Sequence, residues 1–191
     1  MLTHYLISPP LIAGLLTMLA LAVYSDLTKR KIPNTVVLFG LVFSLIFQLL
    51  DVGSAGAFSW IFGVIVGFLC FFPLYLLRGM AAGDVKLMMA VGGFLGYPLV
   101  ITAALYSLIA GGLMAIMYLI YNGKLGQLIT TIKLLAFNIF VKKTTGQPLY
   151  ESSSSETSLG RMPYAQAIAV GTFIACYLQA QKNSFNTLLI N

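Results

Sequence analysis

The run LMMAVGGFLGYPLVITAALYSLIAGGLMAIMYLIYNG, residues 87–123, contains no Asp, Glu, Lys or Arg. A helix needs roughly 20 apolar residues to cross a bilayer, so the run has room for two crossings. In its middle, Gly96-Tyr97-Pro98 predicts a turn, because proline lacks a backbone donor and glycine tolerates unusual dihedral angles. Whether this run crosses once or twice decides the topology of the whole chain.

Four further stretches also lack charged residues, and each is long enough for one crossing. They are residues 1–25, 32–50, 52–77 and 162–181. Together with two crossings in the long run, they predict an all-α membrane protein of about six transmembrane helices. The length favours a single membrane-embedded domain over residues 1–191.

The composition supports lipid as the main solvent of this chain. Of its 191 residues, 59% are hydrophobic and 8% are charged, and the mean hydropathy is +0.94. A soluble domain carries about 25% charged residues. The net charge of +6 lies in short clusters between uncharged runs, without the basic stripe or aromatic platform of a nucleic-acid-binding protein. We therefore expect the bilayer, and no nucleic acid, as a partner.

The positions of the basic residues favour two crossings for the long run. With two crossings, the loops at 28–34, 78–86 and 122–161 all lie on one side of the membrane. They hold ten of the eleven basic residues, and only Lys182 falls on the other side. Cytoplasmic loops carry an excess of Lys and Arg. The pattern predicts a cytoplasmic loop at 122–161, with both termini outside the cytoplasm.

The predicted cytoplasmic loop divides into two parts. Its first part, residues 124–141, places apolar residues at helical spacing with polar residues between them, which predicts an amphipathic helix on the cytoplasmic membrane face. The serine-rich part, residues 144–160, has no apolar periodicity and predicts a mobile segment. The apolar positions of the first part are Leu125, Leu128, Ile129, Ile132, Leu135 and Ile139.

The chain offers few metal ligands. Cys70 and Cys176 both lie in apolar runs, where a cysteine usually packs as a small hydrophobic residue. His4 is the only histidine. A zinc site needs three or four Cys, His or carboxylate ligands. We expect no metal and no cofactor.

Two of the five acidic residues have unusual positions. Asp51 falls in a short outside loop, and Glu151 and Glu156 fall in the serine-rich segment, where charges are solvated. Asp26 ends the first predicted helix and Asp84 begins the fourth, so both lie at the cytoplasmic boundary. Carboxylates at membrane depth are costly and usually mark a proton, ion or catalytic site.

Both acids also have an ordinary structural interpretation. Asp84 could cap its helix by accepting backbone N–H bonds. Asp26 could be an interfacial charge that pairs with Lys29 or Arg30. Position alone does not decide between these interpretations and a functional one.

Three motifs resemble those of prepilin and preflagellin peptidases. The string D-L-T-K-R-K-I-P-N, residues 26–34, resembles the segment that follows the first catalytic aspartate of that family. The string A-A-G-D-V-K-L, residues 81–87, is similar to its G-x-G-D-x-K-L motif. The string M-P-Y-A-Q-A-I-A-V-G, residues 162–171, resembles the last helix of the short prepilin peptidases that serve tight-adherence pili. One departure is Ala81, which replaces the first motif glycine and cannot adopt a positive φ cheaply.

The resemblance implies an aspartic endopeptidase in the inner membrane, with its active site facing the cytoplasm. Asp26 and Asp84 would be catalytic, with Gly83 and Lys86 in supporting or substrate-binding positions. The implied substrate is a pilin-like precursor with a basic cytoplasmic leader. Larger members carry an insert with two C-x-x-C pairs and methylate the new N-terminus; this chain lacks such pairs, so no N-methyltransferase activity is expected. Nothing in the sequence indicates an oligomeric state.

Helix ends suggest separate roles for the two acids. A helix N-terminus favours negative charge and a C-terminus disfavours it. Because Asp84 begins a helix and Asp26 ends one, we assign Asp84 as the base that activates water and Asp26 as the protonated acid. The absence of a side chain at Gly83 would let an extended substrate backbone approach closely.

Three other functions remain open at this point. A presenilin-type or signal-peptide-peptidase-type protease is one, but that group has a Y-D string and a P-A-L string, whereas here Ser25 separates Tyr24 from Asp26 and P-A-L is absent. A small proton-coupled transporter is the second, although transporters more often place such acids near the midplane. A non-catalytic assembly factor is the third.

Overall fold

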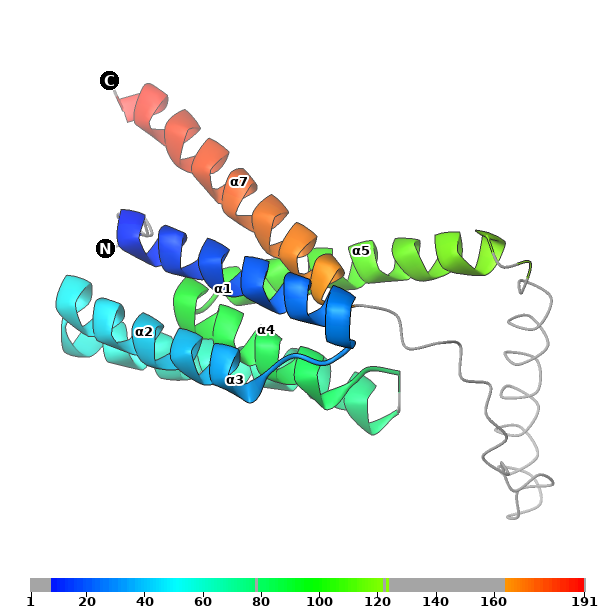
Figure 1. The fold of residues 1–191 in the computed structure, drawn as a ribbon. Helices are drawn as coiled ribbons and strands as arrows, with labels where there is room; N and C mark the ends of the chain where they lie inside the picture. The colour runs from blue at the N-terminus through cyan, green and yellow to red at the C-terminus, as the bar shows by residue number, and fades with distance from the viewer. Residues whose placement is uncertain (1–7, 78, 122, 124–163, 191) are drawn as a thin grey trace, which may run out of the picture. The chain divides into compact units, whose positions relative to one another are not determined.

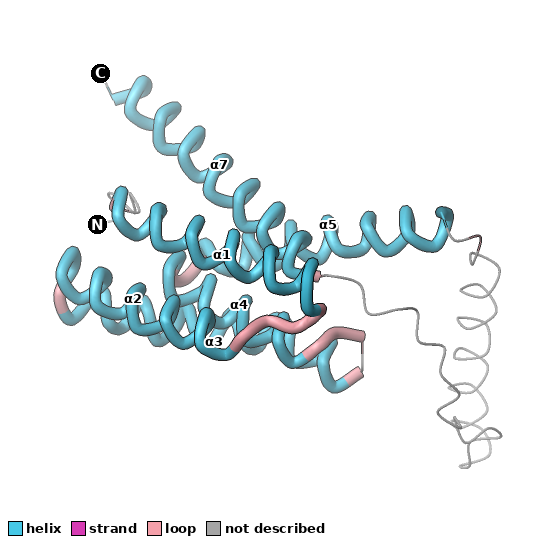
Figure 2. The backbone as a smooth tube through the Cα atoms, in the orientation of Figure 1, coloured by secondary structure: helices cyan, strands magenta, loops and turns pink. Residues whose placement is uncertain are grey.

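In the computed structural model, residues 8–77, 79–121, 123 and 164–190 are described, and every regular element in these ranges is an α-helix (Figures 1 and 2). The all-α class predicted from the sequence is thereby confirmed. The helices are α1 (Pro9–Lys29), α2 (Asn34–Val52), α3 (Ser54–Leu76), α4 (Ala82–Leu95), α5 (Leu99–Tyr121) and α7 (Ala165–Ile190).

The long uncharged run is divided where the sequence predicts a turn. Helix α4 ends at Leu95 and α5 begins at Leu99. Between them, Gly96 has a φ of 66°, a left-handed conformation that glycine adopts without steric cost. The Gly96 N–H donates to the Gly92 carbonyl at 2.8 Å and closes the last turn of α4.

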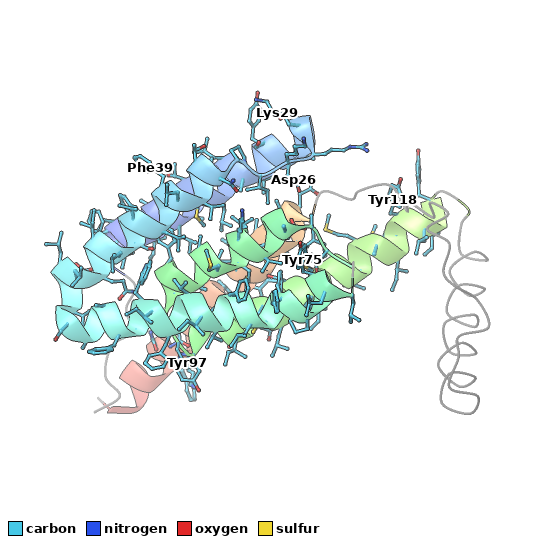
Figure 3. All side chains as sticks on the ribbon, turned by 90° about the horizontal axis from the view of Figure 1, so that it is seen from below. Asp26, Lys29, Phe39, Tyr75, Tyr97 and Tyr118 are labelled. Atoms are coloured by element: carbon cyan, nitrogen blue, oxygen red, sulfur yellow. The ribbon has the colours of Figure 1, made fainter. Side chains whose placement is uncertain are left out.

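Among the residues that the structure describes, four helices are long and apolar enough to cross a membrane, namely α1, α2, α3 and α5. Large apolar side chains face outward on these helices; Phe39, for example, is 78% exposed on α2 (Figure 3). The protein is therefore a membrane protein. Helix α4 has 14 residues, which rise about 21 Å at 1.5 Å per residue. Helix α7 has 26 residues, and its second half contains Gln179, Gln181 and Lys182.

The predicted count of six crossings thus remains a prediction. The predicted amphipathic helix at 124–141 and the serine-rich segment at 144–160 lie outside the described residues. Cys70 and Cys176 are free and half-buried, in keeping with their interpretation as packing residues.

The chain forms two compact units. The first consists of residues 1–112 and 163–191, and the second of residues 113–162. The first unit contains α1 to α4, the beginning of α5, and α7. Both acidic residues of interest, Asp26 and Asp84, belong to this first unit.

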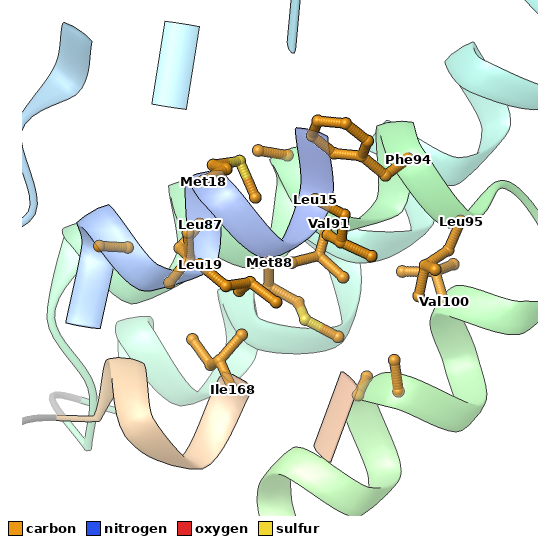
Figure 4. Packing of buried hydrophobic residues seen from close by; sticks show 14 of the residues in the cluster. Leu15, Met18, Leu19, Leu87, Met88, Val91, Phe94, Leu95, Val100 and Ile168 are labelled. Atoms are coloured by element: carbon orange, nitrogen blue, oxygen red, sulfur yellow. The ribbon is translucent and has the colours of Figure 1, made fainter. Parts of the chain in front are cut away.

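Helix α4 is the central element of the first unit, where it packs against α1, α2, α3 and α7. Ten of its 14 residues are buried. Figure 4 shows its side chains among those of α1 and α7, and the contact includes Leu87, Met88, Leu15, Leu19 and Ile168. Burial of most of its surface explains why α4 shows no clear apolar face, and packing against four helices fixes the position of Asp84 at its N-terminal end.

Glycines allow α3 and α4 to approach each other closely. A Cβ atom added at Gly63 would collide with the carbonyl of Gly92, and one added at Gly67 would lie 2.5 Å from the carbonyl of Met88. Small residues four positions apart let helix backbones pack tightly in membranes, where van der Waals contact drives helix association. The Gly63–Gly67 pair therefore sets the distance between these two helices.

Side-chain hydrogen bonds stabilise the C-terminal end of α4. The Gln48 side chain on α2 donates to the Phe94 carbonyl at 3.4 Å. Beside it, the Trp60 indole on α3 donates to the Ser44 hydroxyl at 2.9 Å. Such bonds satisfy polar groups that would otherwise be costly inside an apolar environment. They link α2, α3 and α4 at the end of α4 opposite to Asp84.

Candidate active site

Asp26 lies in the last turn of α1, where the chain turns toward α2. The helix ends because Arg30 adopts a left-handed conformation with a φ of 50°, while its N–H donates to the Asp26 carbonyl at 2.9 Å. The Ser25 hydroxyl donates to the Lys31 carbonyl at 2.9 Å and fixes the turn. Figure 3 shows Asp26 near the end of α1, one helical turn before Lys29.

The Asp26 carboxyl group is bonded to the beginning of α7. Its Oδ2 atom accepts a hydrogen bond from the backbone N–H of Ala165 at 3.0 Å, across 139 residues of sequence. The described residues give Asp26 this backbone donor rather than the salt bridge with Lys29 or Arg30 that the sequence left open. We did not predict this contact. The motif at residues 162–171 and the predicted topology, which puts the start of the last helix on the side of Asp26, were the available signals.

Asp84 is the third residue of α4 and caps that helix. Its Oδ2 atom accepts the Ala81 N–H at 3.2 Å, and its own N–H donates to the Ala81 carbonyl at 3.1 Å. The capping role that the sequence left open is therefore present. Ala81 has φ −81° and ψ 151°, an extended conformation that any residue adopts. Alanine in place of the motif glycine thus causes no backbone strain here.

Both carboxyl groups lie in the interior of the first unit. Asp26 is 7% exposed and Asp84 is 6% exposed, and the two are close enough for their charges to interact. Like charges at short distance resist joint ionisation, so a pair of this kind tends to hold one proton between its two carboxyls.

The environment of the pair alters our assignment of acid and base. The sequence argument placed Asp26 only at the C-terminus of α1. The structure also places it at the N-terminus of α7, whose first N–H groups have no partner inside the helix and favour negative charge. Because Asp84 accepts a backbone N–H at the N-terminus of α4 as well, helix ends do not distinguish the two groups, and the separate roles lose their support.

Gly83 lies in the first turn of α4, next to Ile32. A Cβ atom added at Gly83 would lie 3.5 Å from the Ile32 Cβ, which is an ordinary contact. Its φ is not in the left-handed region, since the positive-φ glycines are at other positions. The fold itself therefore does not require glycine at this position.

Lys86 connects two of the motifs. Its ammonium group donates to the side-chain oxygen of Asn34 at 3.1 Å on the exposed surface. Figure 2 shows why this contact is possible, since the loop between α1 and α2 runs beside the segment that leads into α4. Asn34 is the first residue of α2, and Pro33 precedes it as the N-cap. The Lys86–Asn34 hydrogen bond thus links the segment after Asp26 to the segment around Asp84.

Within the described ranges, no three His, Cys, Asp or Glu side chains gather into a group that could hold a metal ion.

The sequence profile of the type IV leader peptidase family matches residues 13–116, more than half of the chain. This chain belongs to the type IV leader peptidase family. The matched region contains both Asp26 and Asp84, and it ends before α7. A search of curated proteins and a search of solved structures gave no match. Membership in the type IV leader peptidase family identifies the protein as a peptidase and carries the expectation, in general terms, of a pilin-like precursor as substrate.

Proposed function

We propose that this protein is an aspartic-type endopeptidase that removes the basic leader peptide from type IV pilin-like precursors. The observation that carries the proposal is the pair of buried carboxyls, Asp26 on α1 and Asp84 on α4, at one end of a single compact unit in a member of a leader peptidase family. Gly83 and Lys86 adjoin the pair and are proposed as supporting residues.

Two carboxyls that share one proton supply both proton transfers of peptide hydrolysis. The ionised carboxyl takes a proton from a water molecule as the water oxygen attacks the scissile carbonyl. The protonated carboxyl then gives its proton to the leaving amine as the C–N bond breaks. The pair ends with one proton, as it began, so the cycle needs no other proton donor.

The proposed topology places the pair at the inner surface of the cell membrane. Six crossings, with both termini outside, would put Asp26 beside Lys29, Arg30 and Lys31 on the cytoplasmic side. A precursor with a basic leader in the cytoplasm and a hydrophobic helix in the bilayer would present its cleavage point at this depth. The motif at 162–171 favours a pilin of the tight-adherence type. With two cysteines in the chain, no C-x-x-C pairs are available for the insert of the methylating enzymes.

The direct test uses the purified protein in lipid vesicles together with a tight-adherence prepilin. We expect a shortened product whose N-terminal sequence begins after the basic leader, and whose mass shows no added methyl group when a methyl donor is present. A precursor that stays intact with correctly inserted enzyme would exclude the peptidase proposal. A methylated product would exclude only the statement about methyl transfer.

Replacing Gly83 by alanine separates folding from substrate approach. Alanine fits beside Ile32, and in a helix it is favoured over glycine by about 0.5–1 kcal/mol, so the unfolding free energy should stay equal or rise. If the substrate backbone passes Gly83, the added methyl group should lower cleavage by about tenfold or more, since overpacking costs about 1–3 kcal/mol. Cleavage rates and thermal unfolding of the same preparation measure both effects. Wild-type cleavage by Gly83→Ala would show that the substrate does not approach this position.

Loss of the hydrogen bond between Lys86 and Asn34 should have a modest effect on the cleavage rate. Exposed pairs contribute about 0.2–1 kcal/mol, so Lys86→Ala or Asn34→Ala should lower the cleavage rate by about two- to fivefold. The double variant should be no worse than the poorer single variant, because both remove one bond. Lys182→Ala, an exposed lysine on α7, is the matched control. Fully additive losses would mean that the bond itself does not support the site.

A further inference from the structure

We propose that the beginning of α7, Tyr164 and Ala165, is a third component of the catalytic site. Ala165 would orient the carboxyl of Asp26 through its backbone N–H, and Tyr164 would hold that N–H in place. Both are positioning residues, since they act on the reaction through Asp26. This inference rests on the proposed peptidase function.

The hydrogen bond from Ala165 to Asp26 satisfies a buried donor at the start of a helix. Ala165 has no exposed surface, so its N–H cannot bond to solvent. It is the first residue of α7, and the first N–H groups of a helix have no partner inside the helix. The Asp26 carboxyl at 3.0 Å satisfies this donor, and the positive end of the helix faces the carboxyl. One hydrogen bond therefore satisfies the helix-terminal donor and also stabilises the buried carboxyl.

Tyr164 is fixed on several sides. Its hydroxyl donates to the Ser107 carbonyl on α5 at 3.3 Å. Its ring meets Phe71 of α3 edge to face, with the ring centroids 6.1 Å apart and the planes at 74°. The ring also occupies the space over Gly111, where any Cβ atom would overlap it. The Tyr164 carbonyl accepts the Ile168 N–H at 3.2 Å and begins the helix.

These contacts determine where the Ala165 donor points. Because Tyr164 directly precedes Ala165, anchoring its ring on α3 and its hydroxyl on α5 restricts the backbone at the start of α7. The Ala165 donor in turn contacts the Asp26 carboxyl, so the anchored segment reaches one of the two acids directly. Catalysis by a pair of carboxyls depends on their mutual orientation, and small displacements of a catalytic group can lower the rate by orders of magnitude.

The first test removes only the Tyr164 hydroxyl. In lipid vesicles, Tyr164→Phe should lower kcat by about three- to tenfold, the effect of one neutral hydrogen bond, with KM within about twofold of wild type. Tyr97→Phe, the same change in the turn between α4 and α5, should leave both constants unchanged. Wild-type kcat for Tyr164→Phe would overturn the anchoring role of this hydroxyl.

The second test removes the donor without adding atoms. Incorporating lactic acid at position 165 by nonsense suppression in cell-free synthesis replaces the amide N–H by an ester oxygen. Loss of a hydrogen bond to a charged group should lower kcat by about 10- to 100-fold, with KM little changed. The corresponding ester at Leu99, the first residue of α5, controls for loss of a helix-terminal N–H.

The outcomes separate this inference from the proposed function. An ester at position 165 that cleaves like wild type would overturn the positioning role while leaving the peptidase function intact. A loss of cleavage that accompanies a lower unfolding temperature, and that disappears when the assay is cooled, would indicate a purely structural role. That result would also overturn the positioning role. Failure of the unmodified protein to cleave would instead refute the function.

Discussion

Replacing either Asp26 or Asp84 by asparagine is expected to lower the rate of leader removal by about 10³-fold or more, since positioned acid–base groups contribute about 10²–10⁴-fold each. Asparagine keeps the size and shape of the side chain but neither takes nor gives the proton. Each carboxyl also accepts a backbone N–H, which the amide oxygen of asparagine still accepts. The fold should therefore survive, and the loss should appear in single-turnover cleavage rates in vesicles.

A control variant and a double variant test whether the two aspartates act as a pair. Asp51→Asn is the matched control. The structure places Asp51 in the last turn of α2 rather than in the predicted loop, but it is exposed and should not affect cleavage. The double variant Asp26→Asn with Asp84→Asn should be no slower than the slower single variant, since groups that act as a unit are not additive. If either single variant retains a tenth of the wild-type rate, the two residues do not form a catalytic pair.

Replacing Gly63 by alanine is expected to destabilise the protein by about 1–3 kcal/mol or more, the usual cost of overpacking. The added Cβ atom would collide with the Gly92 carbonyl and approach the Gly96 Cα at 2.9 Å, and both neighbours are backbone atoms that cannot rotate away. Helix propensity acts in the opposite direction, because alanine is favoured over glycine by about 1 kcal/mol in a helix. Thermal or denaturant unfolding in detergent would measure the net effect.

A glycine in open surroundings provides the control for this change. A Cβ atom added at Gly112 on α5 would meet nothing within 4 Å, so Gly112→Ala should leave stability equal or raise it by up to about 1 kcal/mol. If Gly63→Ala and Gly112→Ala change stability alike, close packing between α3 and α4 does not limit the stability of the unit. Because α4 carries Asp84, we also expect Gly63→Ala to lower cleavage in the fraction that remains folded.

Local signals in the sequence allowed much of the fold to be predicted. Gly96-Tyr97-Pro98 marks the boundary between α4 and α5, because this turn depends on the dihedral limits of single residues. Apolar length also predicted α1, α2, α3 and α5 as helices able to cross a membrane. The central place of α4 was not predictable from its amphipathicity, since ten of its 14 residues are buried and leave little polar face.

The candidate site was predictable only in part. Asp26 and Asp84 were selected because acids are rare in this chain and these two lie at helix ends. The Ala165 donor escaped prediction, because a backbone N–H has no signature in the sequence and its partner lies 139 residues away. The contact between Lys86 and Asn34 escaped for a similar reason, since sequence does not report which loops are neighbours.

The compact unit that holds both acids is discontinuous, because the chain leaves it at Gly112 and returns at Pro163. The two pieces meet through α7, which contacts α1 and α4 by packing and by the Ala165 bond. A fragment that stops after α5 would retain both carboxyls but leave one of them without its donor. Two separately expressed halves, divided between α5 and α7, should for the same reason recover cleavage only when they are inserted together, which would make this protein a candidate for a split-enzyme reporter of membrane assembly.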